Sequence, residues 1–391
     1  MRVAETAYVF GAGINRAPGS KDEGRQKPPL VNDFFQLFLN SPVLDQVKHN
    51  PKGAQRYQKL LEYIERYWKL TEDDLKASPF DLEECFTLLQ LQRTEQPRGS
   101  QQYRELLQLE SDLTSLMGRY LGKFEEQFLY ANALEELGEK IWQEQSSVLT
   151  FNYDLILERA IETAAGDTGH RPSKKMLEAH ESIPDDLLDK HTWKWARALG
   201  YGVQFDEIQL QRLKKRPGLV EGKRFYNHQN NVLHNPPLLK LHGSLNWFEH
   251  TSVAATDTSA ANPKDGTSVL LEGYPWNLFG LGPPEIDGWL LEPLIIIPVL
   301  HKDLSTHLIK ETWTQAKNEL QQCQRLVIGG YSFPASDFHT RKLLLEAFEN
   351  HSPQQLIIIN PDSSVVSTAK SLCHFDKPVT VCANLQEYLA L

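Results

Sequence analysis

The chain has 391 residues and a mass of 44.7 kDa, so one large α/β domain with insertions, or two domains, is expected. Its formal net charge is -10, and its Lys and Arg residues are scattered without a long basic block, which disfavours a nucleic-acid-binding surface. The four cysteines form no Cys-x-x-Cys pair and no apolar run approaches the roughly 20 residues that span a bilayer, so a structural zinc site, a disulfide framework and a membrane segment are not expected.

The first predicted strand, residues 7–10, runs directly into Gly11-Ala12-Gly13. A glycine turn in this place lets backbone N–H groups approach a pyrophosphate, although it is equally compatible with a plain tight turn. The third glycine of the G-x-G-x-x-G pattern is missing, since Arg16 occupies its position. The polar segment 16–29 reads as a loop that closes over a cofactor or as a surface connection. A helix is predicted to follow, with Asn32 or Asp33 as its cap.

Residues 41–145 have apolar side chains at three- and four-residue spacing, which predicts a helical subdomain inserted after the first strand–helix unit. Within it, Asp81, Glu83 and Glu84 place three carboxylates close together. The interpretation favoured is a helix N-terminal cap and a solvated face, rather than a metal site or an acid pair.

The second buried strand, residues 147–151, ends on Asn152-Tyr153-Asp154, and a helix is predicted over 155–164. An amide and a carboxylate at a strand's carboxyl end suit ribose hydroxyls or a water molecule. The alternative is an Asx turn that caps the helix, which explains Asp154 better than Asn152. Residues 166–235 follow as a long polar insertion, with Trp193, Trp195, Tyr201 and Phe205 as its expected anchors.

The stretch 238–248 predicts a short buried strand that delivers His242, Gly243 and Ser244 at its end. A histidine there exchanges protons near neutral pH, and Gly243 lets a ligand approach the backbone. The alternative is a half-buried structural histidine. Residues 250–284 are rich in Ser, Thr, Ala, Gly and Pro and predict an irregular excursion, after which 294–298 restore a strand and 303–322 a helix.

The last third predicts two more strands, 325–328 and 355–359, which end in Gly329-Gly330-Tyr331-Ser332 and in Asn360. A helix is predicted over 340–348, and Pro361 is expected to open another. Near-continuous apolar strands that alternate with helices predict an α/β fold with a Rossmann-like parallel sheet covered on both faces. The predicted catalytic core comprises 1–40, 146–165, 236–250 and 290–391; residues 41–145 form the helical subdomain, and 166–235 and 251–289 are insertions.

These five strand ends, in this order, resemble the sirtuin superfamily of NAD-binding proteins. The resemblance rests on Gly11 to Gly13, on Thr150 with Asn152 and Asp154, on His242-Gly243, on Gly330 with Ser332, and on Asn360. It covers about half of the chain and leaves the helical region and the insertions outside. Protein-deacylating sirtuins carry two Cys-x-x-Cys pairs for zinc, and this chain has none. The stretches Lys-Leu-His-Gly-Ser-Leu-Asn-Trp, Thr-Phe-Asn-Tyr-Asp and Pro-Leu-x-x-Asp-Phe-Phe are similar instead to the zinc-free sirtuin-like NAD+ hydrolases of bacterial antiphage defence.

This resemblance implies a hydrolase that cleaves NAD+ to nicotinamide and ADP-ribose, with NAD+ as substrate and no metal. Asn152 is expected to position water or the nicotinamide ribose, His242 to act as base, and Asp154 to orient the site or the nicotinamide amide. Gly11, Gly13 and Ser332 are expected to face the phosphates, and Asn360 the adenosine ribose. The full set expected to bind the dinucleotide is Gly11, Ala12, Gly13, Asn15, Asp33, Thr150, Gly243, Ser244, Gly330, Ser332 and Asn360.

Two other functions stay open at this stage. One is an NAD-dependent protein deacylase or ADP-ribosyltransferase, and the other is a non-catalytic module that senses NAD or ADP-ribose. Because a free NAD+ hydrolase would kill its own cell, control by homo-oligomerisation or by a separately encoded ATPase or nucleic-acid-guided defence partner is expected. The expected location is the cytoplasm, since no signal peptide is recognisable.

Overall fold

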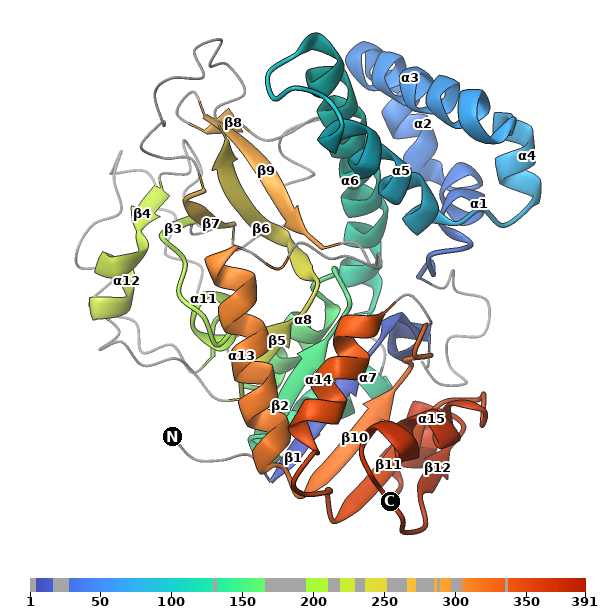
Figure 1. The fold of residues 1–391 in the computed structure, drawn as a ribbon. Helices are drawn as coiled ribbons and strands as arrows, with labels where there is room; N and C mark the ends of the chain where they lie inside the picture. Colours follow the sequence, from blue (N-terminus) through green and yellow to red (C-terminus); the bar gives the residue numbers. More distant parts are fainter. Residues whose placement is uncertain are drawn as a thin grey trace.

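The computed structural model describes residues 5–16, 28–128, 132–165, 195–209, 219–228, 236–251, 266–271, 285–286, 289–296, 304, 306–334 and 337–391 (Figure 1). They build a parallel sheet with helices on both faces, a helical region and a second sheet. None of the helices in these ranges combines the length and apolar character needed to cross a membrane.

The first sheet contains six parallel strands. In spatial order they are β12 (Thr380–Cys382), β11 (Gln355–Ile359), β10 (Arg325–Gly329), β1 (Thr6–Phe10), β2 (Ser147–Thr150) and β5 (Leu238–Lys240). Numbered within this sheet alone and read from β5, the order is 3-2-1-4-5-6, which is the doubly wound dinucleotide-binding arrangement. The predicted α/β fold with a Rossmann-like parallel sheet is therefore confirmed.

Alternate side chains of β1 enter two separate hydrophobic clusters, as period-two geometry requires. Ala7 and Val9 pack toward α13 (His307–Gln322), α14 (Phe338–Ala347) and α15 (Val365–Leu372). Tyr8 and Phe10 pack toward α7 (Asn132–Glu144), α8 (Ile156–Ala164) and α16 (Leu385–Leu389). Helix α15 begins at Val365 rather than at Pro361, because Asn360 and Asp362 first form successive Asx turns, accepting the N–H groups of Asp362 at 3.0 Å and Ser364 at 2.9 Å.

The helical region lies beside the carboxyl edge of the parallel sheet (Figure 1). It contains α1 (Phe34–Leu39), α2 (Pro42–His49), α3 (Pro51–Trp68), α4 (Glu72–Ala77), α5 (Leu82–Thr94) and α6 (Gln101–Phe128). Asp81 caps α5 by accepting the N–H groups of Glu83 at 2.8 Å and Glu84 at 3.4 Å, as expected from the sequence. The apolar side chains of this region continue the same cluster that covers one face of the parallel sheet.

The second sheet was not predicted. Its spatial order is β4 (Leu219–Glu221), β3 (Glu207–Gln209), β7 (Ser268–Leu271), β6 (Gly243–Thr251), β9 (Trp289–Ile295) and β8 (Glu285–Ile286). All its neighbouring strands are antiparallel except the β3–β7 pair. From the 166–235 insertion, the predicted anchors Trp195, Tyr201 and Phe205 are buried, whereas Trp193 lies outside the described residues.

The short strand predicted at the start of the stretch 238–248 is confirmed as β5, which ends at Lys240 just before His242; the residues from Gly243 onward form β6 in the other sheet. Gly243 makes this break with a φ of 73°, and a Cβ there would lie 2.0 Å from the Leu294 carbonyl oxygen. The strand predicted over 294–298 is corrected: it is the end of β9 in the second sheet, because Ile295 pairs with Gly243.

Candidate active site

A cavity of about 770 Å³ lies along the carboxyl edge of the parallel sheet. It is centred on β1 and β10, whose connections lead to opposite sides of the sheet and so open a crevice between them. The residues expected from sequence that line it are Gly11, Ala12, Gly13, Asn152, Asp154, His242, Gly330, Ser332 and Asn360. The other expected residues, Asn15, Asp33, Thr150, Gly243 and Ser244, do not line it among the described contacts.

Asn152 is buried at the cavity wall with an unsatisfied amide. The residue is 5% exposed, and neither its Oδ1 nor its Nδ2 has a hydrogen-bond partner in the described structure. Its backbone is fixed, since its N–H donates to the Thr150 hydroxyl at 3.1 Å. A buried polar group left in this state costs about 1–3 kcal/mol, which a ligand with both a donor and an acceptor would recover.

Asp154 is held from two sides. The Asn15 side-chain amide donates to its carboxylate at 2.8 Å, and one of its oxygens accepts the N–H of Ile156 at 3.0 Å, which is the Asx turn considered from sequence. Burial raises the pKa of the Asp154 carboxyl, and the nearby charge of Lys240 opposes that effect. Both groups that bond this carboxylate come from the protein itself, so the position of the Asp154 side chain is fixed.

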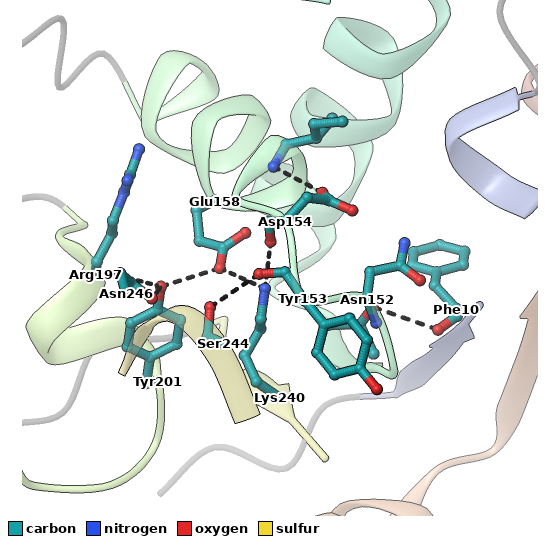
Figure 2. Close-up of polar contacts among 12 residues, drawn as sticks. Phe10, Asn152, Tyr153, Asp154, Glu158, Arg197, Tyr201, Lys240, Ser244 and Asn246 are labelled. Atoms are coloured by element: carbon teal, nitrogen blue, oxygen red, sulfur yellow. Dashed lines mark hydrogen bonds and ion pairs between the residues drawn. The ribbon is translucent and has the colours of Figure 1, made fainter. Parts of the chain in front are cut away.

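A buried ion pair lies beneath the turn from Asn152 to Asp154 (Figure 2). Figure 2 shows Lys240 extending from β5 toward the Asp154 carbonyl oxygen, which its ammonium contacts, and toward Glu158, at 2.9 Å. The Tyr201 hydroxyl also donates to Glu158, at 2.9 Å, and accepts from the Asn246 side-chain amide at 3.1 Å.

A second set of bonds fixes the same turn at Tyr153. Its carbonyl oxygen accepts from the Ser244 hydroxyl at 3.3 Å and from the Leu245 N–H at 3.0 Å. Residues from β5, β6, α8 and the 166–235 insertion therefore hold the backbone that presents Asn152.

His242 faces the cavity in the link between the two sheets and is 4% exposed. Its Nε2 lies 3.9 Å from the carboxylate of Asp337, and its ring centroid lies 5.0 Å from that of Phe151. Asp337 is held in turn by the Tyr331 hydroxyl at 2.5 Å and the Thr340 hydroxyl at 2.7 Å. Burial raises the pKa of Tyr331, so this hydroxyl stays protonated and donates.

The glycine turns after β1 and β10 are joined by backbone hydrogen bonds. The Gly11 N–H donates to the Gly329 carbonyl at 3.0 Å, and the Gly13 N–H donates to the Gly330 carbonyl at 3.0 Å. A Cβ on Gly11 would lie 2.6 Å from the Gly330 oxygen, and Gly330 itself has a φ of 60°. These N–H groups are used inside the protein, and the glycines serve close packing. Gly11 and Gly13 still line the cavity, and that they face the phosphates stays a prediction.

The side chains of Ser332 and Asn360 differ in how available they are to bind a ligand. Ser332 is exposed and lines the cavity. The Asn360 amide already joins the ends of two strands, since its Nδ2 donates to the Tyr331 carbonyl at 3.3 Å and its Oδ1 accepts the Asp362 N–H at 3.0 Å.

Several lining residues were missed from sequence. Arg16, Tyr331 and Asp337 line the cavity, and the helical region adds Leu82, Glu83, Met117 and Leu121. Asp33, expected to contact the ligand, instead pairs with Arg16. Two sequence signals bear on this wall. The carboxylate cluster at 81–84 predicts a cap and a solvated face, and the Pro-Leu-x-x-Asp-Phe-Phe stretch supplies Pro29, Leu30 and Phe34 to the cavity.

No group of three or more His, Cys, Asp or Glu side chains that could hold a metal ion occurs within the described ranges. The arrangement offers the unsatisfied amide of Asn152, the imidazole of His242 beside a fixed carboxylate, and the exposed hydroxyl of Ser332 just after the second glycine turn. Such a set can bind a polar ligand and move a proton next to it.

No protein-family model and no curated protein matches the chain. Among solved structures, it is similar to a Sir2 homologue–NAD complex, with 13% identity, a TM-score of 0.37, and coverage of 99% of this chain and 87% of that one. It is also similar to a mutant Sir2 homologue bound to ADP-ribose, with 13% identity, a TM-score of 0.35, and coverage of 99% and 89%. A Sir2 structure with an inhibitor, 2'-O-acetyl-ADP-ribose and a deacetylated peptide gives 12% identity, a TM-score of 0.34, and coverage of 98% and 90%.

Proposed function

We propose that the chain is an NAD+ hydrolase that cleaves the bond between nicotinamide and ribose and releases nicotinamide and ADP-ribose. The observation that carries the proposal is the Asn152 side chain, buried at the switch point of a dinucleotide-type sheet with both polar atoms unsatisfied. The cavity volume of about 770 Å³ suits a ligand of dinucleotide size, since ligand sites span roughly 300–1,000 Å³.

The protein has to supply little covalent chemistry for this reaction. Nicotinamide leaves as a neutral group from a cationic ring, and the ribose passes through an oxocarbenium-like state. The site must hold the ribose, exclude bulk water and place one water molecule. Asn152 supplies a donor and an acceptor for this purpose, and the pair beneath it, Lys240 with Glu158, keeps its backbone in place.

His242 acts as the base toward the water or a ribose hydroxyl. The Asp337 carboxylate, 3.9 Å from its Nε2, stabilises the imidazolium that forms when the proton is taken. The carboxylates of Asp337 and Asp154 also place negative charge near the developing positive charge of the ribose.

In the cell, the proposed role is depletion of NAD+ during antiphage defence, by abortive infection. The support for this setting is the resemblance of the strand-end motifs to zinc-free defence proteins. Homo-oligomerisation, or a separately encoded ATPase or nucleic-acid-guided partner, is proposed to hold the activity in check.

Nicotinamide release from NAD+ by the purified chain tests the function. We expect Asn152→Ala and His242→Ala each to lower turnover by at least about 100-fold. We also expect Asn152→Ala to leave the free energy of unfolding unchanged or raised, because it removes an unsatisfied buried amide. Urea denaturation checks this second point.

Matched controls are Asn350→Ala, at an exposed asparagine, and His307→Ala, whose side chain is 93% exposed. Both should retain full turnover. An active Asn152→Ala protein would contradict the assigned role. Deacylation of an acyl-lysine peptide coupled to NAD+ consumption would support a deacylase, and binding of NAD+ without nicotinamide release, at every protein concentration, would support a sensing module.

A further inference from the structure

Arg16 lies at the end of the short 3-10 helix η1 (Ala12–Arg16) and lines the cavity. Its Nε donates to the Pro28 carbonyl at 2.8 Å, and its Nη2 contacts the Asp33 carboxylate. Asp33 is itself fixed, because it accepts the Leu30 N–H at 2.6 Å. The two bonds to Pro28 and Asp33 orient the guanidinium while using two of its five N–H donors.

The cavity wall carries more negative than positive charge. Asp81, Glu83, Asp154 and Asp337 line it, whereas Arg16 is the one Lys or Arg among the lining residues in the described part of the chain. The diphosphate of a dinucleotide brings two further negative charges into this space. Repulsion between like charges in a partly desolvated site would oppose binding unless a cation lies next to the phosphates.

The glycine turn offers less help than its sequence suggests. The N–H groups of Gly11 and Gly13 bond to the loop after β10, and the Ile14 N–H bonds back to the Gly11 carbonyl at 3.1 Å. Giving the Gly11 and Gly13 donors to a phosphate would require breaking the hydrogen bonds between the two glycine turns. The anion must therefore be held by other groups that border the same turn.

We infer that Arg16, oriented by Asp33, is the residue that binds the diphosphate of the dinucleotide. A guanidinium matches phosphate geometry with two parallel N–H groups and stays charged at every physiological pH. Asp33 then acts by positioning Arg16, which explains why an acidic residue adjoins an anion site without lining it. This inference rests on the proposed function and adds the residue that recognises the charged part of the substrate.

The test is calorimetric binding of ADP-ribose, ADP, AMP and adenosine to the full chain and to Arg16→Gln and Arg16→Lys. We expect Arg16→Gln to weaken ADP-ribose and ADP by roughly 10- to 100-fold, as for loss of charge-assisted hydrogen bonds, and to leave adenosine unchanged. Arg16→Lys should lose less affinity for ADP-ribose and ADP than Arg16→Gln, because lysine keeps the positive charge but not the two parallel N–H groups. Arg66→Gln, at an exposed arginine of α3, is the control and should change none of the four.

If Arg16→Gln binds all four ligands as the wild type does, or loses adenosine as strongly as ADP, the role of Arg16 is wrong while the proposed function stands. If the wild type binds none of them, the proposed function itself fails. Circular dichroism of both variants checks the fold, and Arg16→Lys keeps the test decisive should Arg16→Gln not fold.

Discussion

Lys240 and Glu158 bring opposite charges together beneath the turn that presents Asn152, with side chains 1% and 0% exposed. Such a pair fixes the geometry of the turn more than it stabilises the fold. Removing two ions from water costs nearly as much free energy as their attraction contributes. Its bond to the Asp154 carbonyl oxygen makes the position of Asn152 depend on charges that the ligand never touches. None of this was inferred from sequence, since a lysine inside an apolar strand gives no sign of which carboxylate it meets.

Replacing Lys240 with Met should lower the free energy of unfolding by about 3–5 kcal/mol, because Glu158 then stays buried without its partner. The double variant Lys240→Met/Glu158→Gln should lose less free energy of unfolding than Lys240→Met alone. Urea denaturation measures both. Lys342→Met is the matched control, since Lys342 is 72% exposed and should cost no more than about 0.5 kcal/mol. Equal losses from Lys240→Met and Lys342→Met would refute the argument.

Helix α6 carries a polar residue into the apolar cluster of the helical region. Asp112 is 1% exposed, and burial raises the pKa of its carboxyl to about 6 although Arg56 and Gln108 oppose this effect. In the folded chain Asp112 thus keeps its proton up to a higher pH than in the unfolded chain. Stability linked to this group is present at low pH and falls as the pH rises from near 4 to about 6.

Asp112→Asn should remove the loss of stability that occurs as the pH rises. Relative to the wild type, the variant should gain on the order of 2 kcal/mol in free energy of unfolding between pH 4.5 and pH 7.5. Urea denaturation at the two pH values measures the difference. Asp73→Asn, at a carboxylate that is 95% exposed, should show the pH dependence of the wild type. A parallel pH dependence for Asp112→Asn and wild type would mean that Asp112 is already charged in the folded state.

Strands could be predicted from the sequence where a run of apolar residues was by itself enough to identify them. Strands β1, β2, β10 and β11 are short and predominantly apolar, with polar residues only at their ends, which favours a buried parallel sheet. The second sheet escaped prediction because its strands β7 and β8 are brief and lie among Ser, Thr, Gly and Pro residues. An apolar run also says nothing about which sheet it enters, and the break at Gly243 depends on a contact with Leu294, 51 positions along the chain.

At the scale of the whole molecule, the cavity belongs to two parts of the chain at once. The parallel sheet supplies Asn152 and His242, and α5 and α6 supply Leu82, Met117 and Leu121. The strand-end half of the site could be predicted, because parallel strands bring their carboxyl ends to one edge. The helical half could not, since it follows from how separate segments pack.

Binding of ADP-ribose should therefore slow amide hydrogen exchange in both parts, near Gly330 and near Leu82 and Met117, because a ligand that closes the cavity suppresses local opening on each side. Hydrogen–deuterium exchange with mass spectrometry checks this. Helix α12 (Gly222–His228), whose described residues do not line the cavity, should exchange at an unchanged rate. Protection limited to the parallel sheet would show that the helical wall does not close on the ligand.

The pairing of Thr6 with Arg325 also has a consequence for how the chain is made. A ribosome adds roughly 5–20 residues per second, so β1 waits some 15 to 60 seconds for β10, its neighbour at the centre of the sheet. Until then Gly11 and Gly13 have no Gly329 or Gly330 to bond, and the crevice between the two strands does not exist. A nascent chain would thus be unable to form this cavity before most of its length had emerged, a delay imposed by strand order alone.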